Sequence, residues 1–435
     1  MPQIAPWFPD AKFGVFIHWT LKNCEMALDE PVGEMSHDLQ RQWAREYWTA
    51  ANYDPKQWAE MFAGWGAKYA VLTTKHHIGF TLFDSPVSRF SAANSAPAGR
   101  DLVGPYVDAL RAAGLKVGLY YSLPDWSHPD YASCAGGDDR RKYSETDEPE
   151  RWARFVEDMF AEIRHLCTAY GKIDCLWFDG DWERSAEQWH SVELAAMIQQ
   201  LQPEAIFNNR LRHRCLGHYG TPESDYPVGA RQGFNEFCGT PGDNWDGQAA
   251  NENIIGPGEM VRLFCDNLTL GMNTMLNVAP HPDGTIPQVQ ADAMAKLGEW
   301  IKPHAEAIYA TEGGLPVGLF NGGSSHRDSV LYLYAYDTPR DELVVKGLGS
   351  QVKRITHLRT GKELSFRYSG GRNKFGRSGW LFIRVPAEMM DEHATVIRVE
   401  FEDDICQAAG PDGQTVRWRG RPVFDEQALY DSRDV

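Results

Sequence analysis

The feature that most constrains this chain is the alternation, up to about residue 310, of short apolar runs with longer helix-like segments. The apolar runs favour strands, and the segments between them carry apolar residues at the three-to-four spacing of helices. Strands are predicted at 12–19, 69–77, 115–123, 173–179, 205–210, 234–238 and 274–279, and helices at 55–66, 101–113, 149–169, 185–201, 257–271 and 288–310. This alternation is typical of repeated βα units around a parallel sheet.

The predicted strands share a polarity: most begin apolar and end in polar or aromatic residues. Examples of such ends are His18-Trp19, His76-His77, Asp179 and Arg210. In a (β/α)8 barrel the carboxyl ends of the strands and the loops after them form the active-site face. We therefore expect a (β/α)8-like barrel whose strand ends converge on one pocket. Because seven strands are recognised instead of eight, the barrel is expected to be irregular or to contain a strand without a clear pattern.

The pattern changes after about residue 315 to strands with period-two alternation and no helices between them. This pattern favours a small antiparallel β-sandwich, and the glycine-rich stretch 313–325 supplies a joint. A chain of 435 residues also exceeds the size at which one hydrophobic core usually stops growing. The sequence predicts a catalytic barrel domain over 1–314 and a sandwich domain over 315–435.

Charge and cysteine usage exclude several kinds of partner. Sixty acidic against forty-three basic residues give a net charge of -17, which repels phosphate backbones and anionic lipids, so neither nucleic acid nor membrane is expected as a partner. The eight cysteines form no CxxC pair and do not cluster with histidine, so free thiols and no metal centre are predicted.

The sequence as it stands begins without a signal peptide, which predicts a cytoplasmic protein, or a periplasmic or secreted one if a leader was removed.

The sharpest chemical signal is LWFDGDW at 176–182, an apolar strand that ends in two carboxylates flanked by indoles. A carboxylate at the end of a buried strand is costly unless it is paired or used. Asp179 is therefore a candidate glycosidase nucleophile. The alternative is that Asp179 or Asp181 only caps a helix or forms a turn.

A retaining glycosidase needs a second carboxylate about 5–5.5 Å from the first, acting as acid and then as base. Glu236, in GFNEFCG, is the predicted acid/base, since its apolar neighbours Phe234 and Phe237 would raise its pKa. A buried, salt-bridging glutamate is the competing interpretation. The other candidates for the role are Glu223, Glu252 and Asp243.

Other polar residues of the predicted strand ends suit sugar binding. His76 and His77 are adjacent, and neighbouring side chains of a regular strand point to opposite faces, which argues against a shared metal ion. Neutral imidazoles at a barrel mouth suit hydrogen bonds to sugar hydroxyls, although a buried structural histidine is the plainer interpretation. Arg210 could bind a sugar oxygen or keep a carboxylate ionised.

Five segments, in order, resemble those of glycoside hydrolase family 29, the alpha-L-fucosidases, from about Trp7 to Pro287. They are WFPDAKFGVFIHW, AKYAVLTTKHH with GF, GLYYSLPDW, LWFDGDW and TMLNVAPHPDGTIP. The chain departs from the family at Ile78, where an aspartate is usual, at Phe-Asn-Glu in place of Trp-Glu before the acid/base, and at APHPDG in place of GPTADG. These departures concern loop geometry and leaving-group preference more than the nucleophile.

The resemblance implies a (β/α)8-like barrel followed by a β-sandwich and hydrolysis by double displacement with retention. It implies that Asp179 is the nucleophile and Glu236 the acid/base. The residues implied to bind fucose are His18, Trp19, Glu46, Tyr47, His76, His77, Tyr121, Trp177 and Arg210, with Tyr120 as the alternative to Tyr121.

The predicted function is therefore that of a retaining exo-glycosidase, an alpha-L-fucosidase, acting on terminal alpha-L-fucosides of oligosaccharides or glycoconjugates. No metal or organic cofactor is required, and a homo-oligomer is left open. The alternatives are a retaining exo-glycosidase for a related sugar such as a galactoside, a metal-dependent hydrolase built from the histidines and Asp179, and a non-catalytic sugar-binding protein.

Overall fold

The computed structural model divides the chain into two units, each with its own core. The first comprises Met1–Asp225, Gly233–Pro257 and Asn273–Lys302, and the second Tyr226–Gln232, Gly258–Met272 and Pro303–Val435. The residues described are 2–27, 36–132, 148–213, 215–224, 226, 229, 232–316, 318–369, 379–403 and 405. The predicted domain border between 314 and 315 falls inside the second unit.

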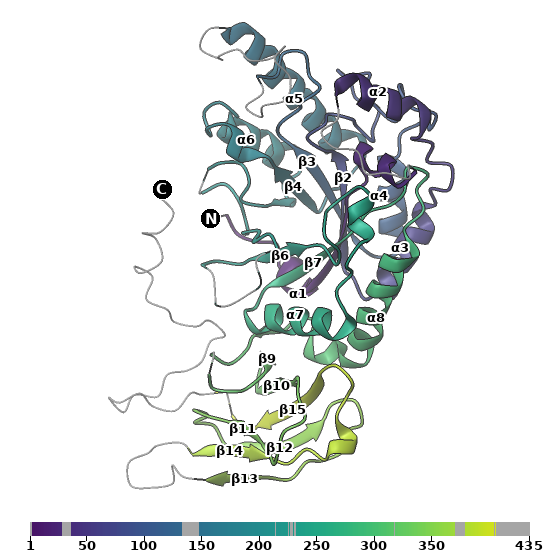
Figure 1. The fold of residues 1–435 in the computed structure, drawn as a ribbon. Helices are drawn as coiled ribbons and strands as arrows, with labels where there is room; N and C mark the ends of the chain where they lie inside the picture. Colours follow the sequence, from purple (N-terminus) through teal and green to yellow (C-terminus); the bar gives the residue numbers. More distant parts are fainter. Residues whose placement is uncertain are drawn as a thin grey trace. The chain divides into compact units, whose positions relative to one another are not determined.

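A parallel sheet forms the centre of the first unit (Figure 1). Its strands follow the order β5-β4-β3-β2-β1-β7-β6, and every pairing is parallel. The strands are β1 (Phe13–Ile17), β2 (Tyr69–Lys75), β3 (Lys116–Ser122), β4 (Cys175–Asp179), β5 (Ile206–Phe207), β6 (Glu236–Gly239) and β7 (Asn273–Val278). All seven lie within predicted strands or extend them by one residue, because each is a short run buried on both faces.

An irregular segment at 218–224 connects the two edge strands, β5 and β6. His218 donates its backbone N–H to Phe207 in β5 at 2.9 Å, and Tyr219 forms a parallel bridge with Asn208. On the other side Glu236 donates its backbone N–H to Gly220 at 2.9 Å, and Glu223 bridges Cys238 in β6. This segment occupies the position of the eighth strand, which the sequence pattern did not reveal.

Helices of the first unit follow its strands in the order expected of βα units, and Figure 1 shows several of them around the sheet. Helix α5 illustrates the cause: Pro149 starts it, and its apolar face, which includes Phe155, Met159 and Ile163, is buried. The helices of the first unit are α1 (Trp7–Ala11), α2 (His37–Glu46), α3 (Pro55–Gly64), α4 (Val103–Ala112), α5 (Pro149–Ala169), α6 (Ser191–Leu201) and most of α8 (Gln288–His304), whereas α7 (Pro257–Thr269) falls almost entirely in the second unit. Short 3-10 helices are η1 (Leu21–Ala27), η3 (Asp181–Glu183), η4 (Gln248–Asn251) and η5 (Ala305–Ala307). None of the helices described is long and apolar enough to cross a membrane.

Aromatic side chains fill the interior of the barrel. Tyr120 stacks on Trp177 with ring centroids 5.5 Å apart and an interplanar angle of 18°, and Phe16 lies 5.0 Å from Trp177. The same buried cluster contains Phe8, Tyr69, Val71, Cys175, Ile206, Tyr219, Cys238 and Met275. Because these residues pack the body of the barrel, polar chemistry is confined to the carboxyl ends of the strands.

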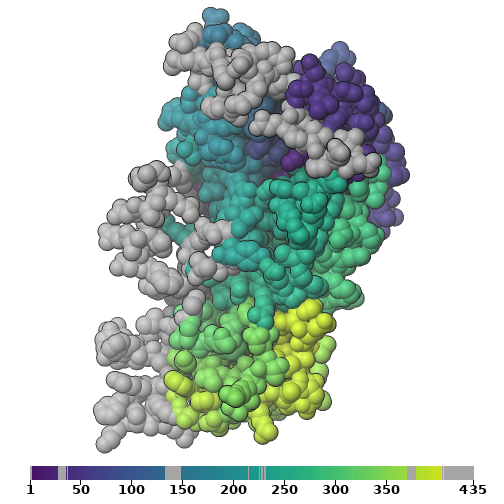
Figure 2. Space-filling model, viewed as in Figure 1, coloured from purple at the N-terminus to yellow at the C-terminus, as the bar shows by residue number. Residues whose placement is uncertain are grey.

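The second unit contains two antiparallel sheets, as the period-two pattern predicted (green to yellow in Figures 1 and 2). One sheet has the order β12-β15-β10-β9-β8 and the other β11-β14-β13. Their strands are β8 (Glu312–Gly313), β9 (Gly323–Arg327), β10 (Val330–Ala335), β11 (Leu343–Val345), β12 (Val352–His357), β13 (Phe366–Ser369), β14 (Trp380–Ile383) and β15 (Thr395–Phe401). A 3-10 helix, η6, covers Ala387–Met389. Inward-facing residues such as Leu331, Leu333, Ile355, Ile383 and Val399 form their shared core.

Candidate active site

Polar side chains from the carboxyl ends of several strands meet at one end of the barrel. His18 directly follows β1, His76 and His77 follow β2, and Asp179 ends β4. Strand β2 ends at Lys75, so the two histidines lie beyond the regular alternation, and their rings are 4.4 Å apart. The geometry thus brings together side chains that are far apart along the chain.

Asp179 is the centre of this cluster. Its Oδ1 accepts a hydrogen bond from Arg210 Nη1 at 2.6 Å, and its Oδ2 accepts one from the Tyr120 hydroxyl at 2.9 Å. His77 Nε2 lies 3.5 Å from the same Oδ2. Burial by itself would raise the pKa of Asp179, but the Arg210 guanidinium and these donors outweigh it and hold the pKa below its ordinary value. Asp179 is therefore ionised at neutral pH, and 12% of its side chain stays accessible.

Arg210 joins two carboxylates. Besides Asp179, its Nη2 donates to Glu223 Oε2 at 2.7 Å, while its Nε donates to Thr221 Oγ1 at 2.9 Å. The guanidinium carbon lies 4.6 Å from the centre of the Trp177 ring, where the aromatic face supports the cation. These contacts fix the guanidinium from several sides, so it can hold both carboxylates in place.

Glu223 lies on the irregular eighth segment, beside the carboxyl end of the barrel. Its bridge to Cys238 places it near the end of β6, and 41% of its side chain is exposed. Asp179 and Glu223 are thus two carboxylates bound to one guanidinium, one nearly buried and the other open to solvent.

Three histidines form one side of the site. His18 Nδ1 lies 2.7 Å from Asn277 Oδ1, and its ring centroid is 5.7 Å from that of His76. Burial lowers the pKa of His18, His76 and His77 to about 4 in each case, so all three are neutral at neutral pH. Neutral imidazoles can both donate and accept hydrogen bonds, which suits recognition of sugar hydroxyls.

Aromatic rings border the histidines. The Trp245 ring lies 4.8 Å from His18, and the Trp126 ring lies 5.1 Å from His77. Trp182, on η3, is 54% exposed and its ring centre is 6.1 Å from that of His77. Exposed and half-buried indoles next to polar groups provide flat apolar faces for sugar rings.

Six of the residues predicted for the site lie in this cluster: His18, His76, His77, Trp177, Asp179 and Arg210. Two further members, Trp245 and Asp246, were not predicted as site residues, and Tyr120 was the alternative to Tyr121. Tyr120 contacts Asp179, and Trp245 contacts His18. Asp246 accepts a hydrogen bond from Thr20 at 2.6 Å, and its charge acts on His18 and His76. Trp245 and Asp246 lie on a loop, where no strand pattern marks which side chains point inward.

Glu236, the predicted acid/base, lies elsewhere. It is the first residue of β6, pairs with the first residue of β7, and has no exposed surface. Its carboxylate accepts hydrogen bonds from the Tyr69 hydroxyl and from Trp177 Nε1. Burial raises its pKa to about 7, although both hydrogen bonds oppose the change. The direction of this shift is as expected, but a carboxyl group enclosed in the barrel core cannot reach a leaving group, so the structure argues against the predicted role.

Two predicted binding residues point to the outside of the barrel. The Tyr121 hydroxyl donates to Glu162 of α5 at 2.7 Å, and Trp19 Nε1 donates to the His281 carbonyl at 2.8 Å. Both are fully buried between strands and helices, so neither can contact a substrate in the barrel mouth. The reason is strand alternation, since the inward-facing neighbours are Tyr120 and His18.

The remaining predicted residues are not part of the described cluster. Glu46, the last residue of α2, is exposed and accepts a hydrogen bond from Gln42 at 3.0 Å, while Tyr47 is half-buried. Of the alternative acids, Asp243 accepts a hydrogen bond from Asn253 at 2.6 Å and Glu252 is exposed.

The described cysteines are free, whereas Cys134 and Cys406 lie outside the described residues. Within the described parts of the chain, no group of three His, Cys, Asp or Glu side chains is arranged to hold a metal ion.

Comparisons with known proteins agree with this geometry. The family model described as Alpha-L-fucosidase matches residues 2–306. Human tissue alpha-L-fucosidase is 31% identical over 338 residues, which cover 71% of this chain and 69% of the human protein. The mouse enzyme is also 31% identical, over 342 residues that cover 71% of this chain and 72% of that protein.

Solved structures extend the likeness to both units. Alpha-L-fucosidase isoenzyme 1 from Paenibacillus thiaminolyticus has a TM-score of 0.80 and 32% identity, covering 91% of this chain and 98% of that one. A Bacteroides thetaiotaomicron alpha-L-fucosidase, trapped as a covalent intermediate with 2-fluoro-fucosyl fluoride, has a TM-score of 0.78 and 25% identity, covering 91% of this chain and 95% of that one. The predicted fold class and enzyme class are confirmed, and the chain belongs to the alpha-L-fucosidase family, glycoside hydrolase family 29.

Proposed function

We propose that this alpha-L-fucosidase uses Asp179 as its nucleophile and Glu223 as its acid/base, in a double displacement that retains the anomeric configuration. The observation that carries the proposal is the Arg210 guanidinium, which is hydrogen-bonded to Asp179 at 2.6 Å and to Glu223 at 2.7 Å. Two carboxylate oxygens on one guanidinium can be at most about 7–8 Å apart. That range includes the separation of about 5–5.5 Å typical of retaining glycosidases.

Asp179 suits the nucleophile because the site keeps it ionised. Its Oδ1 is held by Arg210, and its Oδ2 receives the Tyr120 hydroxyl, so the carboxylate has a fixed orientation at the end of β4. In the first step Asp179 attacks the anomeric carbon and forms an ester bond as the bond to the leaving oxygen breaks.

Glu223 suits the acid/base because its side chain is exposed where a leaving group would depart. In protonated form it would donate its proton to the leaving oxygen during the first step. As a carboxylate it would then take a proton from water, which attacks the anomeric carbon and releases Asp179. Glu236, with no exposed surface, cannot perform either transfer.

The rest of the site supports fucose binding. Neutral His18, His76 and His77 can exchange hydrogen bonds with the sugar hydroxyls, and the Trp245 face suits the apolar C–H surface and the methyl group of fucose. Trp182, exposed beside the nucleophile strand, is placed to stack on the leaving group.

A matched pair of variants tests the acid/base assignment. Glu223→Gln should lose most activity on a natural fucoside, whose leaving group needs a proton. It should keep more activity on an aryl fucoside with a good leaving group, and azide should speed that reaction by replacing the activated water. Glu236→Gln should stay active on both substrates. The assignment fails if Glu236→Gln shows the leaving-group dependence and azide rescue and Glu223→Gln does not.

Labelling tests the nucleophile. After incubation with 2-fluoro-fucosyl fluoride, digestion and mass spectrometry should find the fucosyl ester on the peptide containing LWFDGDW. Asp179→Asn should give no labelled peptide. A label on another carboxylate, in an enzyme that is active on aryl fucosides, would overturn the assignment.

A further inference from the structure

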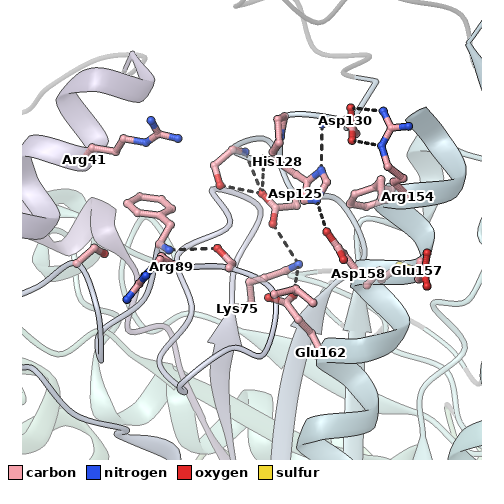
Figure 3. A pocket seen from close by; sticks show the side chains of 18 of the residues that line it. Arg41, Lys75, Arg89, Asp125, His128, Asp130, Arg154, Glu157, Asp158 and Glu162 are labelled. Carbon is pink, nitrogen blue, oxygen red and sulfur yellow. Dashed lines mark hydrogen bonds and ion pairs between the residues drawn. The ribbon is translucent and has the colours of Figure 1, made fainter. Parts of the chain in front are cut away.

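A cavity of about 720 Å³ lies in the first unit, and its lining contains none of the clustered site residues described above (Figure 3). We call it the side pocket. Its lining includes Arg41 and Arg45 from α2, Arg89 and Phe90 from a loop, Asp125 and His128 from the loop after β3, and Glu162 from α5. A cavity of this size falls within the range of about 300–1,000 Å³ that accommodates small organic ligands.

The side pocket and the active site share one wall, the loop at 125–128. Trp126 faces the active site: its ring lies 5.1 Å from His77, and its backbone N–H donates to the His77 carbonyl at 2.8 Å. Asp125 lines the side pocket instead, and its Oδ1 accepts hydrogen bonds from the backbone N–H groups of Ser127 and His128, each at 2.9 Å. The loop at 125–128 thus contacts the active site through Trp126 and lines the side pocket through Asp125, Ser127 and His128.

Several carboxylates on one side of the pocket are held by neighbouring basic groups. The buried Lys75 ammonium lies 2.9 Å from Glu162 and 3.3 Å from Asp125, and His128 lies 3.0 Å from Asp158. Arg154 likewise contacts Asp130 at 2.8 Å. The lining as a whole carries five carboxylates and five Lys or Arg side chains, so any attraction for an anion comes from the arginine side of the pocket and not from its net charge.

The basic side is not neutralised. Arg41, Arg45 and Arg89 are exposed, and within the described parts of the chain none of the three has an ion pair or a side-chain hydrogen bond. Arg41 extends over the Phe90 ring at 6.0 Å. Figure 3 shows Arg41 and Arg89 on the opposite side of the pocket from Asp158 and Glu157. Three guanidinium groups without a partner among the described residues are unusual in a chain with a net charge of -17, where carboxylates are abundant.

We propose that the side pocket is a subsite for an anionic substituent, a sulfate ester or a carboxylate, on the glycan that carries the fucose. This inference rests on the proposed function of the neighbouring site. Planar guanidinium forks bind oxyanions through paired hydrogen bonds, and Phe90 offers an aromatic face for the attached sugar ring. The substrate class would thus be an acidic fucosylated glycan, with the fucose at Asp179 and the acidic unit against the arginines.

The test compares three substrates that differ only in charge: a neutral fucosylated N-acetyllactosamine, the same glycan with a 6-sulfate, and the same glycan with a sialic acid. The double variant Arg41→Gln/Arg89→Gln should lower kcat/KM on an acidic substrate about tenfold, chiefly through KM. It should leave the neutral glycan and an aryl fucoside unchanged. Arg164→Gln is the matched control, since Arg164 is an exposed arginine on α5 outside the lining.

Either acidic substrate can support the proposal, and the one that responds identifies the anion. An unchanged ratio of acidic to neutral kcat/KM in the double variant would overturn it, as would an equal loss in Arg164→Gln. Titration with galactose 6-sulfate and with galacturonate, followed by fluorescence, tests the pocket without turnover and should show binding that the double variant weakens. Failure of the wild-type enzyme on the aryl fucoside would instead refute the proposed function, whatever these titrations show.

Discussion

The buried Glu236 carboxyl group should make the free energy of unfolding of the first unit depend on pH, and the substitution Glu236→Gln should remove this dependence. Burial raises its pKa from an ordinary value of 4.5 to about 7. Because the folded-state pKa lies above the unfolded one, the folded chain keeps a proton that the unfolded chain releases. Wild-type stability should therefore fall as pH rises between 4.5 and 7. At about 1.4 kcal/mol per pKa unit, the loss amounts to about 3 kcal/mol.

Glu236→Gln cannot ionise, so its stability lacks this contribution. The amide has one oxygen in place of two, so one donor, Tyr69 or Trp177, loses its acceptor. That loss costs about 1–3 kcal/mol at every pH. The variant should thus have a lower free energy of unfolding than the wild type at pH 4.5. Between pH 4.5 and pH 8 the free energy of unfolding of the wild type should fall by about 3 kcal/mol relative to that of the variant.

Urea unfolding at both pH values, followed by tryptophan fluorescence, measures this shift. The signal mainly reports the first unit, because Trp380 is the only tryptophan among the described residues of the second. A stability difference that stays the same from pH 4.5 to pH 8 would refute the reasoning. The same protein samples should remain active on an aryl fucoside, as expected of a residue that supports the core.

Three further predictions follow from the site. Asp179→Asn should reduce kcat by a factor on the order of 10^4 without changing the free energy of unfolding by more than about 1 kcal/mol, and near-normal turnover would exclude the nucleophile role. Tyr120→Phe removes a hydrogen bond to Asp179 and should lower kcat/KM about 10–100-fold, whereas Tyr121→Phe should leave kinetics intact and reduce only thermal stability. Burial lowers the pKa of the three site histidines to about 4, so they stay neutral until the pH approaches that value. The Ki of an uncharged fucose analogue should therefore stay constant from pH 8 to 5.5 and rise as the pH falls toward 4. A rise in Ki already near pH 6.5 would contradict this.

Most of the barrel could be predicted from sequence because each regular strand is a continuous apolar run bounded by turns. The side chains at the carboxyl ends followed from the same patterns, as Asp179 and His18 illustrate. Trp19 and Tyr121, which the likeness to family segments implied as binding residues, are buried on the outer side of the barrel. Side chains alternate along β3 and in the residues that follow β1, so Tyr120 and His18 face inward and their neighbours outward.

Glu223, the acid/base proposed above, was harder to single out from the sequence for a physical reason. Glu223 belongs to a segment, HYGTPES, that has no apolar run and forms single bridges instead of a ladder. Tertiary contacts with β5 and β6, which local sequence does not encode, give that segment its place. Glu236 carried the stronger local signal, since its apolar neighbours do raise its pKa, but their packing also closes it off from solvent.

The way the eighth segment is attached has a consequence for how this enzyme could be altered. The regular strands carry Asp179, and the residues just before the site histidines, in continuous ladders, whereas the segment with Glu223 is attached by single bridges at Asn208, Asn235 and Cys238. Tyr219 in this segment packs in the barrel core and Thr221 contacts Arg210, so both have to be kept when the segment is altered. Under the proposed mechanism, changes confined to the surroundings of Glu223 would alter leaving-group preference while the histidines stay in place.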